Sequence, residues 1–163
     1  PAASHIRTYL RLAEELTGRV ANHWSSAAKS GLTAEENETA KVKFPIWGLL
    51  HLYYTGATLA PLRESLVQAK AAADGDETIL RRIEFMESGL DYSAIQGDAY
   101  MIYNKRITDP DRIREIVNRR HQLFGKLYHE YPFSVNIPYI CWREGDWFNK
   151  YLRKIEKRRP AVT

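Results

Sequence analysis

The chain has 163 residues, of which 44% are hydrophobic and 27% are charged, and its formal net charge is +4. This length suffices for one domain with a hydrophobic core, and this composition excludes a disordered chain. No apolar run approaches the ~20 residues of a transmembrane helix, so we expect no membrane partner.

The single cysteine, Cys141, excludes an internal disulfide framework, and we expect it to be buried and structural. Because the chain starts at Pro1 without a methionine, we expect it to be part of a longer polypeptide.

The first predicted helix covers residues 4–24. Its apolar residues recur at steps of three and four, and Ser4 is its candidate N-cap. Serines and a glycine follow, and residues 25–45 read as a polar connection.

A short buried helix is predicted over residues 46–57, because this segment is apolar nearly all round. We expect Gly56 to end it. Thr58 is then the candidate cap of the next helix, which runs to about Ala73 with Pro61 in its first turn.

The longest uninterrupted helical pattern runs from Asp76 to about residue 106, with Asp76 as the cap. We interpret it as the central helix of the domain. Gly89 and Gly97 lie inside it, and we expect both to allow close packing of another helix.

The clearest helix start in the chain is Asp109-Pro110, a capping residue followed by proline at the first helical position. The helix is predicted to continue to about Tyr131, because Pro132 stops it. Its predicted buried face comprises Ile113, Ile116, Val117, Leu123, Phe124, Leu127, Tyr128 and Tyr131.

The last part of the chain is less regular. Residues 133–142 alternate in polarity and contain Pro138, which predicts an extended segment. Asp146 is the candidate cap of a final helix over residues 147–158. The pattern as a whole predicts an all-α fold, a multi-helix bundle of about five to six helices with one extended segment near 133–142. We expect residues 1–163 to form a single domain.

Catalytic and metal-ligating patterns are scarce. The five histidines form no HExxH motif, and no glycine-rich phosphate loop is present, so we assign no catalytic residue, no metal site and no cofactor. Glu84, Glu87 and Asp91 share one helix face, and we expect them to form surface ion pairs beside Arg81 and Arg82.

The best candidate for a ligand-binding surface is a charged turn between two tryptophans. Aromatic rings stack on the C–H faces of sugars, and the charged side chains form forked hydrogen bonds with hydroxyl or anionic groups. The competing interpretation is that both tryptophans anchor the turn to the bundle. The candidate residues are Trp142, Arg143, Glu144, Asp146 and Trp147.

One stretch also resembles a known family. Pro-Leu at 61–62, LxxAKAAADGD and LRRIEFMESGLDY follow one another over residues 61–92. This order resembles the C-terminal helical region of large proteins that carry the module called domain of unknown function 4838, which are similar to glycoside hydrolases of the α-glucuronidase-like kind. The residues that fill the pattern are Leu80, Arg81, Arg82, Ile83, Phe85, Leu90 and Tyr92.

The resemblance implies an accessory helical domain of a carbohydrate-active enzyme. The catalytic carboxylates would lie in a barrel domain of the same polypeptide, so the family supplies no catalytic residue here. The chain would support that barrel and line part of a polysaccharide cleft. The positive net charge suggests an acidic or sulfated polysaccharide, and such an enzyme would be secreted or periplasmic.

Two other functions remain open. A stand-alone helical module could bind a protein or, less favoured, a nucleic acid through its basic end, although cations also suit a helix C-terminus. The basic residues are Lys150, Arg153, Lys154, Lys157, Arg158 and Arg159. A small helical enzyme would instead need a buried polar site, for which the candidates are Tyr100, Tyr103, His121 and Glu130.

Overall fold

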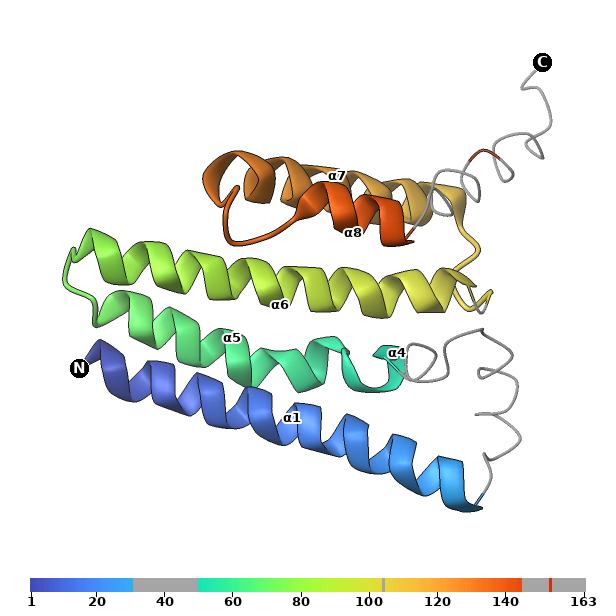
Figure 1. Cartoon of the computed structure of the whole chain (residues 1–163), viewed down its shortest axis with the longest axis horizontal. Helices are drawn as coiled ribbons and strands as arrows, with labels where there is room; N and C mark the ends of the chain where they lie inside the picture. The colour runs from blue at the N-terminus through green and yellow to red at the C-terminus, as the bar shows by residue number, and fades with distance from the viewer. Residues whose placement is uncertain (31–49, 104, 145–152, 154–163) are drawn as a thin grey trace. The chain divides into compact units, whose positions relative to one another are not determined.

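A computed structural model describes residues 1–30, 50–103, 105–144 and 153, with the backbone alone for Trp24, 26–30, Tyr103 and 142–144. These residues form helices and no β-strand, which confirms the all-α prediction (Figure 1). The helices are α1 (Ala2–Ser30), α4 (Leu50–Tyr53), α5 (Gly56–Ala71), α6 (Glu77–Tyr103), α7 (Pro110–Glu130) and α8 (Ile137–Glu144).

The chain divides into two compact units, Pro1–Tyr100 and Met101–Thr163. The first contains α1, α4, α5 and nearly all of α6, and the second contains α7 and α8. The expectation of a single domain stays a prediction.

Helix α1 is longer than predicted at both ends. It begins at Ala2, and Ser4 lies inside its first turn, where its hydroxyl donates to the Pro1 carbonyl oxygen at 2.7 Å. The helix also continues through Ser25 to Ser30. Serine disfavours a helix only mildly, so a run of serines is a weak stop signal.

The start of α5 corrects the predicted cap. Thr55, not Thr58, is the N-cap, and its hydroxyl accepts from the Thr58 backbone N–H at 3.2 Å. The Thr58 hydroxyl in turn accepts from the Thr55 N–H at 3.0 Å, so the two threonines cap each other. Gly56 therefore opens this helix instead of ending the previous one, and Pro61 lies beyond its first turn.

The predicted starts of α6 and α7 are confirmed. An Asp76 carboxylate oxygen accepts from the Ile79 N–H at 3.0 Å, and an Asp109 carboxylate oxygen accepts from the Arg112 N–H at 3.0 Å. Pro110 is the first residue of α7, where its missing N–H leaves no helical hydrogen bond unmade.

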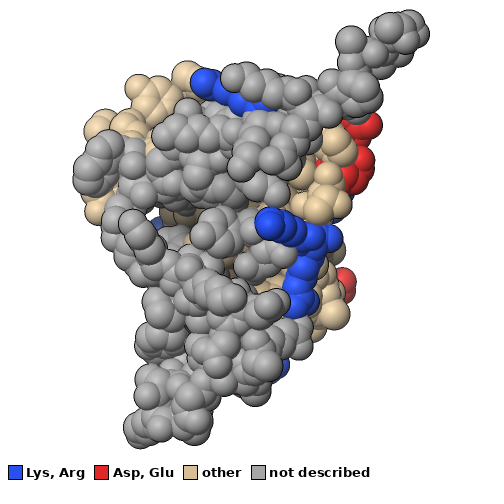
Figure 2. All heavy atoms as spheres, turned by 90° about the vertical axis from the view of Figure 1, so that its right-hand side faces the viewer, with Lys and Arg blue, Asp and Glu red and all other residues tan. Residues whose placement is uncertain are grey.

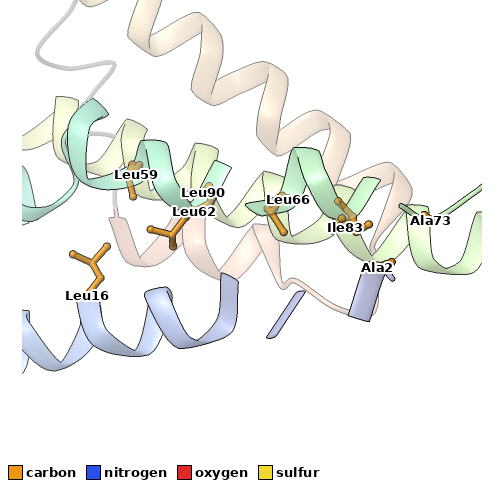
Figure 3. Close-up of a cluster of buried hydrophobic side chains, with 9 residues drawn as sticks. Ala2, Leu16, Leu59, Leu62, Leu66, Ala73, Ile83 and Leu90 are labelled. Carbon is orange, nitrogen blue, oxygen red and sulfur yellow. The ribbon is translucent and has the colours of Figure 1, made fainter. Parts of the chain in front are cut away.

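The core of the first unit is built by α1, α5 and α6 (Figure 3). Leu16 of α1 points toward Leu59 and Leu62 of α5, and Ala2 lies at the other end of the cluster. Each buried leucine contributes roughly 1.5–3 kcal/mol by removing apolar surface from water. The buried members are Ala2, Leu16, Leu59, Leu62, Leu66, Ala69, Ala73, Ile83 and Leu90.

Ion pairs join α5 to α6 along the surface of the first unit. Arg63 contacts Asp91 at 2.7 Å, and Lys70 contacts Glu87 at 3.3 Å and Glu84 at 3.9 Å. Because later residues of α5 pair with earlier residues of α6, the two helices are antiparallel. The ion pairs that we expected of the three carboxylates exist, but they reach across to α5, whose proximity the spacing within α6 could not show.

In the second unit, α7 buries most of the predicted face, with three differences. Tyr131, which was expected to be buried, is the C-cap and only half-buried. Tyr128 is 52% exposed, although it was expected to be buried. Arg120, which we did not expect in the interior, is 6% exposed, and its guanidinium carbon lies 4.3 Å from the centre of the Phe124 ring. A cation over an aromatic face is a favourable contact. The buried side chains of α7 are Ile113, Ile116, Val117, Arg120, Leu123, Phe124 and Leu127.

Helix α8 corrects the prediction of an extended segment over 133–142. Residues Ile137–Glu144 are helical, and Asn136 caps them by accepting from the Tyr139 N–H at 3.0 Å. Pro138 falls in the first turn, where it is tolerated, so it did not indicate a strand. Cys141 belongs to this short helix and is exposed rather than buried.

Candidate functional site

A pocket of about 370 Å³ opens in the first unit between α1, α4 and α6. Pockets that bind small molecules usually measure about 300–1,000 Å³ and combine an apolar lining with a few polar groups. Five of the eight lining residues carry a hydroxyl or an amide. The lining residues are Thr17, Val20, Ala21, Leu50, Tyr54, Tyr92, Ser93 and Gln96.

The pocket has a buried floor and an exposed rim. Val20 and Gln96 are 6% and 5% exposed, so they form the floor. Thr17 and Ala21 are exposed and lie at the rim. Because these residues belong to two long helices, the depth of the pocket is set by rigid elements.

Helical spacing places the lining residues together. Thr17, Val20 and Ala21 lie at steps of three and four, so α1 presents them on one face. On α6, Ser93 and Gln96 are three residues apart and also share a face.

The position of Tyr54 depends on Gly97. A Cβ atom at Gly97 would lie 2.7 Å from the Tyr54 backbone oxygen, a distance too short for any side chain. The missing side chain lets α6 approach the segment between α4 and α5, so the expected close approach exists, but its partner is a turn and not another helix. Gly89 has no such role, since a Cβ atom there would meet nothing within 4 Å.

Two lining hydroxyls are already oriented by their own helices. Thr17 donates to the Ala13 carbonyl oxygen at 2.8 Å, and Ser93 donates to the Gly89 carbonyl oxygen at 2.9 Å. A hydroxyl has one hydrogen and two lone pairs. Each oxygen therefore has capacity left to accept a hydrogen bond from a ligand.

Tyr54 of the lining is half-buried, and its neighbour Tyr53 is held in place by a contact with α1. Burial raises the pKa of the Tyr54 hydroxyl above its ordinary value of 10.0. The neighbouring Tyr53 shares a hydrogen bond of 2.5 Å between its hydroxyl and His23 Nδ1, which ties α4 to α1. The two rings also meet edge to face, with centres 5.7 Å apart.

The predicted tryptophan turn is only partly visible. Trp142, Arg143 and Glu144 belong to the last turn of α8, and their side chains lie outside the described residues, as do Asp146 and Trp147 entirely. The predicted final helix and its basic residues also lie outside the described part, apart from Arg153. Their proposed contact with a ligand stays a prediction.

The proposed buried polar site of a small helical enzyme does not form. His121 and Glu130 are both exposed, and Glu130 lies 4.0 Å from Lys126 in a surface ion pair. The side chain of Tyr103 lies outside the described residues. Sequence spacing placed His121 and Glu130 on α7, but it could not show that both face away from the core.

The surface charges of the described residues are mixed. On the face shown in Figure 2, Lys and Arg side chains lie among acidic and uncharged ones.

Within the described part of the chain, no group of three His, Cys, Asp or Glu side chains is arranged to hold a metal ion. None of the helices described is both long and apolar enough to cross a membrane.

Sequence reasoning did not find this pocket. Its residues come from three segments that are far apart in the chain, and each of them fits a helical core pattern. The one available signal was Gly97, whose missing side chain indicated a close approach without saying which segment approaches.

Comparisons with models of protein families, with curated proteins and with solved structures find no match.

Proposed function

We propose that this chain is a non-catalytic helical domain that supports the catalytic domain of a carbohydrate-active enzyme in the same polypeptide. The observation that carries the proposal is the helical hairpin formed by residues 61–92, the stretch that resembles such proteins. Ile83 and Leu90 of the pattern are buried in the core, and Leu80 packs against it. These three residues of the pattern therefore belong to a scaffold.

The charged residues of the hairpin support the same role. Glu84, Glu87 and Asp91 are engaged with Lys70 and Arg63 of α5, so they stabilise the contact between two helices. A glycosidase needs two carboxylates that face each other across a substrate. These three serve a different purpose, and the catalytic pair is assigned to the other domain.

The test compares this chain with the longer polypeptide that the proposal requires. Both are incubated with neutral, acidic and sulfated polysaccharides, and released reducing ends are measured together with binding by affinity gel electrophoresis. We expect the longer polypeptide to hydrolyse one of these polysaccharides, and this chain alone to hydrolyse none. If neither protein binds or cleaves any glycan, the proposal is wrong.

A second experiment tests whether this domain stabilises the catalytic domain. Leu66 is fully buried, whereas its neighbour Val67 is 56% exposed on the same helix. In the longer polypeptide, Leu66→Ala should shorten the half-life of hydrolysis at elevated temperature, and Val67→Ala should leave it unchanged. Equal half-lives for both variants would show that the catalytic domain does not depend on this one.

A further inference from the structure

We propose that the pocket between α1, α4 and α6 binds one uncharged sugar ring. The choice of a sugar rests on the function proposed above, whereas the location and the neutrality rest on the pocket itself. Three properties of the lining carry the inference: its charge, its hydrogen-bonding capacity and its apolar floor.

The lining selects against a charged ligand. None of the eight lining residues among those described is Lys, Arg, Asp or Glu. An ionised group placed beside Val20 and Leu50 would lose its hydration without a partner, which costs several kcal/mol. The ring bound here is therefore a neutral one, even if the polysaccharide carries acidic groups elsewhere.

The polar atoms of the lining suit hydroxyl donors. Thr17 and Ser93 use their hydrogens on the Ala13 and Gly89 carbonyl oxygens, so both oxygens can accept from a ligand. A pyranose presents such donors around its edge.

The apolar part of the lining suits the carbon face of a sugar. Tyr54 and Tyr92 contribute aromatic rings, and Val20, Ala21 and Leu50 contribute aliphatic groups. A tyrosine side chain combines a large apolar ring with a polar hydroxyl group. It can therefore contact both the C–H face and the hydroxyl groups of a sugar ring. A volume of about 370 Å³ accommodates a single ring and not a long oligosaccharide.

The experiment uses the 163-residue chain and the neutral methyl glycosides of common hexoses, with methyl glucuronide as the charged control. Binding is followed by the shifts of backbone amide resonances in NMR titrations. We expect the amides around Thr17, Ser93 and Gln96 to shift with a neutral glycoside and not with the glucuronide.

The chain offers a matched pair of variants. Thr8 lies on the same helix as Thr17 and is also exposed, and its hydroxyl donates to the Ser4 carbonyl oxygen at 3.1 Å. Thr8 is not part of the pocket. Loss of one hydrogen bond costs about 0.5–1.5 kcal/mol, so Thr17→Val should weaken binding roughly 2- to 12-fold. Thr8→Val should leave the affinity unchanged, while both variants alter helix stability alike.

The outcomes separate the two proposals. Absence of neutral-glycoside shifts at the pocket, equal binding of the glucuronide, or equal effects of Thr17→Val and Thr8→Val would each overturn the pocket proposal. If the longer polypeptide still hydrolyses a polysaccharide in that case, the accessory function stands and only the pocket assignment falls. If a neutral glycoside binds and no hydrolysis occurs, the pocket stands and the accessory function falls.

Discussion

Gly97 is the residue at which the absence of a side chain matters most. A Cβ atom there would lie 2.7 Å from the Tyr54 backbone oxygen, whereas at Gly89 the same atom would meet nothing. Both glycines occupy the interior of α6, and from the sequence alone they had the same interpretation. Only the neighbour in space distinguishes them.

This difference gives two opposite predictions. Gly97→Ala should lower the free energy of unfolding by about 1–3 kcal/mol, because the backbone of Tyr54 must move. Gly89→Ala should raise the free energy of unfolding by up to about 1 kcal/mol, because alanine favours the helix over glycine. Urea denaturation measures both changes. Equal stability of the two variants would show that α6 does not depend on the close approach.

We expect the folded protein to lose stability at high pH because of two half-buried tyrosines. Burial raises the pKa of Tyr9 and of Tyr54 above 10.0 in the folded protein. Their contribution to stability is complete below pH 10, where both states are protonated. Above that, the unfolded chain ionises first, so stability falls as the pH rises toward the folded pKa values.

Urea midpoints between pH 8 and pH 11 test this dependence. The double variant Tyr9→Phe/Tyr54→Phe should show a shallower decline than the parent protein. Replacement of the exposed Tyr128 by phenylalanine is the control and should leave the decline as it is. A double variant that declines as steeply as the parent would rule out these two hydroxyls as the cause.

At the scale of single helices, two starts were predicted correctly and other boundaries were missed. Asp76 and Asp109 cap α6 and α7 as expected, because a cap is a contact between residues three apart in sequence. The end of α1 at Ser30 and the start of α8 at Ile137 were missed. Serines lower helix stability only slightly, and a proline is tolerated in the first turn of a helix. Neither the serine run nor Pro138 therefore determines where α1 ends or α8 begins.

The cap of α7 has a measurable share in stability. Asp109→Ala should lower the free energy of unfolding by about 1 kcal/mol, because the Arg112 N–H loses its acceptor. Asn118, exposed on the same helix, provides the control, and Asn118→Ala should change stability little. If both alanine variants unfold at the same urea concentration, the cap contributes nothing.

We expect the ion pair between α5 and α6 to contribute only weakly to stability. Arg63 and Asp91 form an ion pair at 2.7 Å, with side chains 41% and 45% exposed. A pair that is this open to solvent contributes about 0.2–1 kcal/mol, and salt screens it. A double-mutant cycle with Arg63→Ala and Asp91→Ala measures the coupling free energy. Coupling that persists unchanged at high salt would contradict this account.

At the scale of the whole chain, the core of the first unit determines stability. Leu66 is fully buried, so Leu66→Ala should lower the free energy of unfolding by about 2–5 kcal/mol. Val67→Ala, on the exposed side of α5, should change it by less than about 0.5 kcal/mol. Chemical denaturation followed by circular dichroism distinguishes the two.

The same variant tests whether the chain is a single domain. If residues 1–163 unfold as one cooperative domain, Leu66→Ala must also accelerate amide hydrogen exchange in α7. If the units Pro1–Tyr100 and Met101–Thr163 unfold separately, exchange in α7 stays at its original rate. The single-domain prediction requires the first result.

The amino-acid sequence alone determined the helical class, the two aspartate caps and most of the buried face of α7. These features depend on spacing and on contacts within one or two turns, which a linear chain displays directly. Only the tertiary structure decided which segments meet. It paired the carboxylates of α6 with α5, placed Tyr54 against Gly97 and brought three distant segments together around a pocket whose described lining carries no charge. Such contacts join residues far apart in sequence, so no local pattern records them.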